Sequence, residues 1–161
     1  MTAEVDGRIS TVRHTALAYL AALSGDDPDA VADLVTDDFV NEHQVTIAAG
    51  CAGRAAYRER LPGFFTDFAG RNYEVVGLVV DGERDLWSDG APISGTACAR
   101  YRFTAEVDAP DRPGGRATID VPGVMWIDVE DGLVRRRIDT WDALHYFHQT
   151  GIAPPARPAA D

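Results

Sequence analysis

The apolar residues of this chain follow two different periods, and the change falls near residue 72. Before that point they recur every three or four positions, as on the buried face of a helix. This spacing predicts a first helix that ends at Gly25-Asp26, a short second helix after Asp27-Pro28, and a third after Gly53 that Pro62-Gly63 kinks or splits. The apolar face of the first helix consists of Ile9, Val12, Ala16, Leu17, Leu20 and Leu23.

After residue 72 every second residue tends to be apolar, which is typical of strands. We expect strands in "NYEVVGLVV", near Leu86, over 97–107, in "ATIDVPGVMWIDVE" and in "LVRRRIDTW", with turns at Asp81-Gly82 and Asp131-Gly132. The segment "DDFVNEHQVTI" also looks extended, and "DALHYFHQTG" predicts a short last helix. The strand over 97–107 alternates most clearly. One face carries Ala97, Ala99, Tyr101, Phe103, Ala105 and Val107, and the other Cys98, Arg100, Arg102 and Thr104.

Helices followed by long strands indicate an α+β fold, in which a curved antiparallel or mixed sheet packs around about three N-terminal helices and encloses a pocket. A length of 161 residues suits one domain, which we place at 1–152. The tail 153–161, rich in Pro and Ala, is expected to be disordered. Since the sequence contains neither a long apolar run nor a secretory signal, we expect a cytoplasmic protein.

Charge narrows the range of partners and chemistries. The net charge of −11 argues against nucleic acid and against an anionic membrane as partners. All 15 basic residues are Arg, which excludes Schiff-base catalysis, a pyridoxal-phosphate lysine and a Walker-type lysine. The sequence also lacks the nucleotide-binding, serine-hydrolase and zinc-protease motifs.

Metal and redox sites find little support in the sequence. His145 and His148 could share a helix face, but no acidic or Cys cluster accompanies them, so we expect a solvent-exposed or dimer-facing surface there. Cys51 and Cys98 are expected to be buried, reduced thiols. We therefore expect neither a metal nor an organic cofactor.

The candidate chemistry lies in two extended segments. Asn41 and His43 alternate, so they point to one side of their segment. On the last strand Arg137, Asp139 and Trp141 share a face. Asp139 lies in an apolar context and needs a partner if it is buried. One interpretation is that it forms a salt bridge with Arg100 or Arg102 and does no chemistry.

Four stretches resemble the nuclear transport factor 2-like superfamily, namely "AYLAALSGDDPDAVADLVTDDFV", "AGRAAYRERLPGFF", "VPGVMWIDVEDGLV" and "RRRIDTWDALHYFHQTG". The superfamily includes ketosteroid isomerases, limonene-epoxide hydrolases, scytalone dehydratases and SnoaL-like polyketide cyclases. Asp142, Gln149 and Gly151 in the last stretch are similar to SnoaL-like members. The resemblance implies a cone-shaped α+β roll with an internal pocket.

Residue by residue, the resemblance implies altered active sites. Against ketosteroid isomerases, Tyr19 matches an oxyanion-hole tyrosine, His43 stands at the catalytic-base position, and Gly123 stands where an oxyanion-hole aspartic acid is expected. Against epoxide hydrolases, Arg100 and Asp139 match an Arg and an Asp. In that comparison Arg102 replaces the middle Asp, and His43 replaces the water-holding Asn. SnoaL-like cyclases imply a third pattern, in which an aspartate and a histidine move protons; Asp139 and His43 would form that pair, and the carboxylate would raise the pKa of the imidazole.

The leading hypothesis is a cofactor-independent enzyme of isomerase, cyclase or lyase type, acting by proton transfer on a small, hydrophobic, oxygenated substrate. In it His43 is the base or acid, Asp139 its partner, Tyr19 a hydrogen-bond donor and Arg100 an anion stabiliser. The substrate-binding residues are expected to be Asn41, Trp87, Arg102, Trp126, Arg137 and Trp141, with Tyr73 as a further wall candidate. The alternative is a non-catalytic ligand-binding or dimerisation module, and either is expected to be a homodimer that pairs through the open sheet face. If both residues are catalytic, His43→Ala and Asp139→Asn should each remove activity with little change in melting temperature. In a binding module, Asp139→Asn should mainly lower the stability of the protein.

Overall fold

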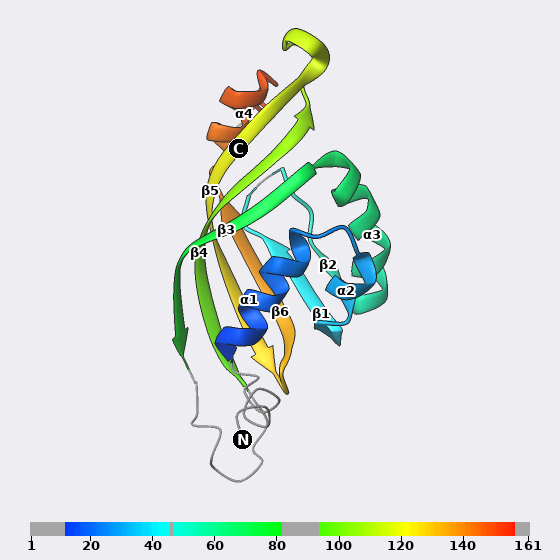
Figure 1. Cartoon of the computed structure of the whole chain (residues 1–161), viewed down its shortest axis with the longest axis vertical. Helices are drawn as coiled ribbons and strands as arrows, with labels where there is room; N and C mark the ends of the chain where they lie inside the picture. The colour runs from blue at the N-terminus through cyan, green and yellow to red at the C-terminus, as the bar shows by residue number, and fades with distance from the viewer. Residues whose placement is uncertain (1–11, 46, 82–93, 157–161) are drawn as a thin grey trace, which may run out of the picture.

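A computed structural model describes residues 12–45, 47–81 and 94–156 (Figure 1). In this part of the chain two helices come first, strands β1 and β2 precede the third helix, and four long strands and a last helix follow. The helices are α1 (Val12–Leu23), α2 (Pro28–Ala32), α3 (Arg54–Asp67) and α4 (Ala143–Thr150), with a short 3-10 helix at Pro113–Gly115. The strands are β1 (Val35–His43), β2 (Cys51–Ala52), β3 (Ala69–Asp81), β4 (Gly95–Asp108), β5 (Arg116–Glu130) and β6 (Leu133–Trp141).

The six strands form one mixed sheet in the order β2-β1-β6-β5-β4-β3. Only β1 and β6 pair in parallel; every other described neighbour pair is antiparallel. The sheet curves, and α1, α2 and α3 lie on its concave side (Figure 1). The predicted α+β class is therefore confirmed. Ile9, Leu86 and residues 157–161 of the expected tail lie outside the described residues.

The core forms between α1 and the concave face of the sheet. On α1 the buried apolar side chains Val12, Ala16, Tyr19, Leu20 and Leu23 repeat at helical spacing. The predicted inner face of β4, from Ala97 to Val107, is buried throughout, while Arg100 and Arg102 are exposed. Pro62 does not split α3, which continues to Asp67. The expectation of buried thiols is wrong, because Cys51 and Cys98 are only half-buried.

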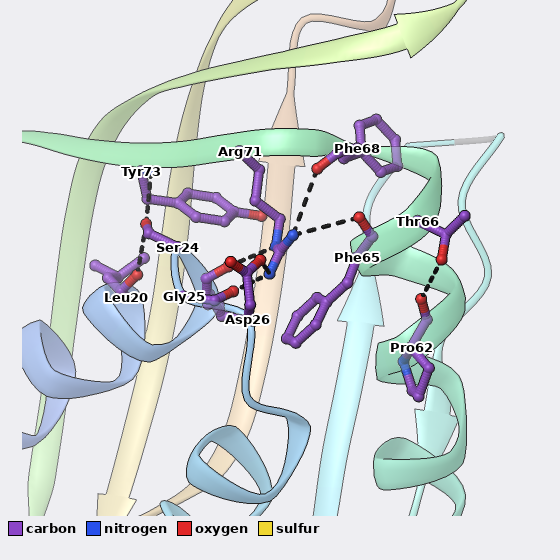
Figure 2. A network of polar contacts seen from close by, with 11 residues as sticks. Leu20, Ser24, Gly25, Asp26, Pro62, Phe65, Thr66, Phe68, Arg71 and Tyr73 are labelled. Atoms are coloured by element: carbon purple, nitrogen blue, oxygen red, sulfur yellow. Dashed lines mark hydrogen bonds and ion pairs between the residues drawn. The ribbon is translucent and has the colours of Figure 1, made fainter.

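A buried arginine joins the helices to the first long strand (Figure 2). Arg71 on β3 is 3% exposed, and its Nε donates to the Leu23 carbonyl at the end of α1 (2.9 Å), while its Nη2 donates to the Gly25 carbonyl. Its Nη1 reaches the carbonyls of Phe65 and Phe68 at the end of α3 (3.4 and 3.5 Å). Carbonyls at helix C-termini lack partners within the helix and carry partial negative charge. Arg71 therefore satisfies both helix ends and fixes α3 against the sheet.

Helix α4 lies along the part of the β5 edge that β6 does not pair with. The Gln149 side chain accepts from the Asp120 backbone N–H (2.8 Å) and donates to the Asp120 carbonyl (3.0 Å), as a neighbouring strand would. Asp142 caps the helix by accepting from the His145 N–H (3.0 Å), and Gly151 ends it in the left-handed conformation. The spacing of Asp142, Gln149 and Gly151 thus positions a helix rather than forming a site.

Candidate functional site

A cavity of about 580 Å³ opens between the concave face of the sheet and helices α3 and α4. Its volume falls within the range of small-molecule sites. Aromatic rings from both helices and from the strands line a large part of it: Tyr57, Phe64, Phe68, Tyr73, Tyr101, Phe103, Trp141 and Tyr146. The site therefore favours a ligand with a sizeable apolar surface.

Strands β1 and β6 contribute a polar patch to this cavity. Their parallel register pairs Asn41 with Arg137 and His43 with Asp139. Because residues two apart on a strand share a face, all four side chains point to the same side of the sheet. All four line the cavity. The structure therefore brings together four of the residues predicted from the sequence, and Trp141 also lines this cavity.

Asp139 forms a buried ion pair, although not with the arginines expected. Its Oδ2 lies 2.5 Å from Arg137 Nη2, with side-chain exposures of 3% for Asp139 and 5% for Arg137. Tyr101 Oη donates to the other oxygen, Oδ1, at 2.7 Å. Burial and the charge of Asp139 raise the pKa of Tyr101 well above its ordinary value. Both carboxylate oxygens thus have protein partners, one of them a cation.

The Tyr101 ring reaches Asp139 by crossing Gly123. These two residues pair directly between β4 and β5. A Cβ at position 123 would lie 2.3 Å from both Cζ and Oη of Tyr101, too close for any real contact. The position matched by resemblance to an oxyanion-hole aspartic acid is therefore covered by a tyrosine ring. Sequence reasoning placed Tyr101 in the core face without a role; the glycine opposite it was the available signal.

A pair of tyrosines, Tyr19 and Tyr57, lies beside the patch. The hydroxyls of Tyr19 and Tyr57 are 2.6 Å apart. Tyr57 lines the cavity, whereas Tyr19 is fully buried and is not among the lining residues. Burial raises the pKa of both hydroxyls, so both stay protonated at neutral pH. Tyr57, which the sequence analysis missed, thus takes the place at the cavity that was expected for Tyr19.

Three buried polar atoms of the patch have no hydrogen-bond partner: Asn41 Oδ1, His43 Nδ1 and Arg137 Nε. Buried polar groups in folded proteins are nearly always paired, so each exception calls for an explanation. All three belong to residues that line the same cavity. Their convergence indicates a site for a ligand that carries polar groups.

The electrostatics of His43 differ from the sequence-based expectation. Its pKa is lowered from 6.5 to about 4, chiefly by burial and then by the positive charge of Arg137, which together outweigh the opposing effect of Asp139. Asp139 raises this pKa as expected, but burial and the charge of Arg137 lower it by more, so the expected net increase was wrong. His43 is therefore neutral at pH 7 and can accept a proton.

This low pKa predicts that the protein loses stability as the pH falls from about 6.5 to about 4. In that window the unfolded chain binds a proton at position 43 and the folded protein does not, so the free energy of unfolding decreases with decreasing pH. Between pH 6.5 and 4.5 we expect wild type to lose about 1–2 kcal/mol more than His43→Gln, allowing for partial solvent screening. Urea denaturation at the two pH values measures the difference, and equal losses in both proteins would contradict the lowered pKa.

Three sequence-predicted residues lie on the outer face of the sheet, away from the cavity. Arg100 is exposed, Arg102 pairs with Glu74 (3.3 Å) and Asp120, and Trp126 is 46% exposed. On β4 the inner positions are the odd-numbered ones, so an anion-stabilising or substrate-binding role for Arg100 or Arg102 does not fit this strand. Trp87 lies outside the described residues.

Comparison with known proteins places this arrangement in a family. A SnoaL-like domain matches residues 16–137, which is most of the chain. The chain belongs to the SnoaL-like domain family. In this SnoaL-like domain the match ends at Arg137, within β6, so it takes in Asn41, His43 and Arg137 and leaves out Asp139. A search of curated protein sequences finds no match for it.

Solved structures share the SnoaL-like fold at low sequence identity. A candidate SnoaL-like polyketide cyclase from Shewanella denitrificans has a TM-score of 0.70 at 15% identity, over 86% of this chain and 95% of that one. A protein with a ketosteroid isomerase-like fold from Catenulispora acidiphila, solved with trimethylamine, has a TM-score of 0.69 at 13% identity, over 86% and 93%. An epoxide hydrolase of the LEH-like type from M. tuberculosis has a TM-score of 0.63 at 16% identity, over 86% and 88%. These similarities confirm the nuclear transport factor 2-like cone.

Among the described residues no group of three His, Cys, Asp or Glu side chains could hold a metal ion, and His145 and His148 are exposed on α4. No described helix is long and apolar enough to cross a membrane.

Proposed function

We propose that this SnoaL-like domain is a cofactor-independent enzyme that moves a proton on a small, hydrophobic, oxygenated substrate. The observation that carries the proposal is the convergence of a neutral imidazole, a buried guanidinium and a protonated phenol on one cavity with many aromatic rings in its wall. These groups are a base and two donors for a negatively charged oxygen. Together they are what enolisation of a carbonyl compound requires.

In the proposed reaction His43 takes a proton from the carbon next to the substrate carbonyl. The C–H electron pair moves into the carbonyl group, and the resulting enolate oxygen accepts from Arg137 and Tyr57. A base with a pKa near 4 suffices where donors hold the oxyanion, as carboxylate bases in related chemistry do. The protonated His43 then returns the proton at a second atom, which completes an isomerisation, or it assists ring closure or elimination.

Asp139 supports this chemistry through Arg137 rather than by contact with the reacting carbon. Its ion pair and the hydrogen bond from Tyr101 fix the guanidinium on the cavity wall. The pair also neutralises Arg137, so the cavity can accept an uncharged substrate without a stranded cation. Arg137 and Tyr57 thereby take the roles that the sequence suggested for Arg100 and Tyr19.

The test is solvent deuterium exchange at C2 of 1-tetralone at pH 7, followed by proton NMR. We expect wild type to accelerate exchange and His43→Gln to lower the enzymatic rate by about 10²–10⁴-fold, the usual contribution of a general base. Glu42→Gln is the matched control, because Glu42 neighbours His43 on β1 and pairs with exposed Arg136 at 2.8 Å. A His43→Gln protein that folds normally and keeps the wild-type rate would contradict the proposal.

A non-catalytic ligand-binding module is the second candidate, and one observation favours it. Both oxygens of Asp139 already have protein partners, as in a purely structural ion pair. This candidate expects 1-tetralone to bind wild type without any acceleration of exchange. The same NMR samples therefore separate the two functions.

Self-association stays a proposal. The outer sheet face exposes Val79, Val124 and Trp126 at 68%, 43% and 46%. A second copy would cover this apolar group.

A further inference from the structure

Asn41 is the one buried group of the patch to which the proposed reaction gives no task. It is 7% exposed, it lines the cavity, and its Oδ1 has no partner. An amide oxygen can only accept a hydrogen bond. Its natural complement is a hydroxyl or N–H group on the bound molecule.

The position of Asn41 fixes where that donor lies on the ligand. Asn41 and Arg137 are direct neighbours across the parallel β1–β6 ladder. Neighbouring strands are about 4.8 Å apart, so the two side chains address atoms that lie close together. Arg137 Nε is a donor that also lacks a partner, and it requires an acceptor such as a carbonyl oxygen.

We propose that the ligand of this cavity is a hydroxy ketone whose hydroxyl is one or two carbons away from its carbonyl. The carbonyl oxygen accepts from Arg137, and the hydroxyl donates to Asn41. The apolar remainder of the molecule lies against the rings of α3 and α4. This inference rests on the proposed function for the role of the carbonyl, and it adds the hydroxyl and the residue that recognises it.

Asn41 thereby determines specificity. A ligand that lacks the hydroxyl leaves Oδ1 buried and unpaired, and an unpaired buried acceptor weakens binding substantially. A ligand with a methyl ether at the same carbon brings a second acceptor against Oδ1. Both analogues should therefore bind more weakly than the hydroxy ketone.

Binding of three matched probes tests the inference: 2-hydroxy-1-tetralone, 2-methoxy-1-tetralone and 1-tetralone, titrated by calorimetry or NMR. We expect wild type to bind the hydroxy compound at least about tenfold more tightly than either analogue. Asn41→Leu should remove this preference and bind 1-tetralone at least as well as wild type does. Glu42→Gln, on the same strand but the opposite face, should keep the preference.

The wild-type comparison decides the matter even if Asn41→Leu fails to fold. Equal binding of the three probes, preference for the methyl ether, a preference that survives in Asn41→Leu, or no binding of any probe would each overturn the inference. Hydroxyl preference without deuterium exchange would support it while removing the proposed catalysis. Exchange without hydroxyl preference would remove this inference and leave the catalysis.

Discussion

Asp139→Asn is expected to lower the free energy of unfolding by about 3–5 kcal/mol, the usual cost of leaving one charge of a buried pair without its partner. Arg137 is 4% exposed, and its Nη2 forms an ion pair with Asp139 Oδ2. The asparagine oxygen can still accept from Tyr101, so the loss arises mainly from the guanidinium. Urea denaturation of wild type and variant at pH 7 measures it.

The double variant Asp139→Asn/Arg137→Met is the control for this result. Removing both charges leaves no stranded ion, so it should be clearly more stable than the sum of the two single changes predicts. Strict additivity would mean that the pair is not coupled in solution.

The ion pair also changes the sequence-based expectation for Asp139→Asn. Because the pair is buried, this variant should be destabilised whether the protein is an enzyme or a binding module. Exchange kinetics, not melting temperature, must separate them.

Gly123→Ala is expected to destabilise the protein through a single methyl group. The new Cβ would lie 2.3 Å from two atoms of the Tyr101 ring, which is only 2% exposed. Overpacking of this kind costs about 1–3 kcal/mol. Displacing Tyr101 also breaks its bond to Asp139, and a bond to a charged group contributes about 1.5–3 kcal/mol. Chemical denaturation, fitted with one denaturant m-value for both proteins, measures the total loss of unfolding free energy.

Two comparisons make this result specific to the Tyr101 ring. In a Tyr101→Leu background Gly123→Ala should cost far less, because the ring is gone. Gly63→Ala on α3 adds the same methyl where nothing lies within 4 Å, and it should be neutral or slightly stabilising, as alanine is in helices. An equal cost of Gly123→Ala with and without the Tyr101 ring would show that the clash is not the cause.

The sequence predicted the fold better than it predicted the site. Apolar periods of about four and of two identified α1 and the buried face of β4, because each depends only on neighbouring residues. The parallel pairing of β1 with β6 depends on contacts almost a hundred residues apart, and no local pattern encodes it. That pairing brings Asn41 and His43 next to Arg137 and Asp139.

The errors at the site also have physical causes. Arg100 was chosen by resemblance, although strand alternation already placed it on the face opposite Tyr101. Arg137 was recognised as a neighbour of Asp139 but not as its ion-pair partner, because nothing in the residue types ranks one arginine above another. The low pKa of His43 depends on burial and on the charge of Arg137, which only the three-dimensional arrangement reveals.

The bonds from Gln149 to Asp120 have a consequence for solubility. A stretch of β5 with unpaired N–H and C=O groups would be a template for strands of other molecules, and such edges promote aggregation. One side-chain amide from α4 occupies both groups at Asp120 and leaves a helix where a foreign strand would have to lie. The C-terminal helix thus keeps this edge of the sheet from recruiting further chains.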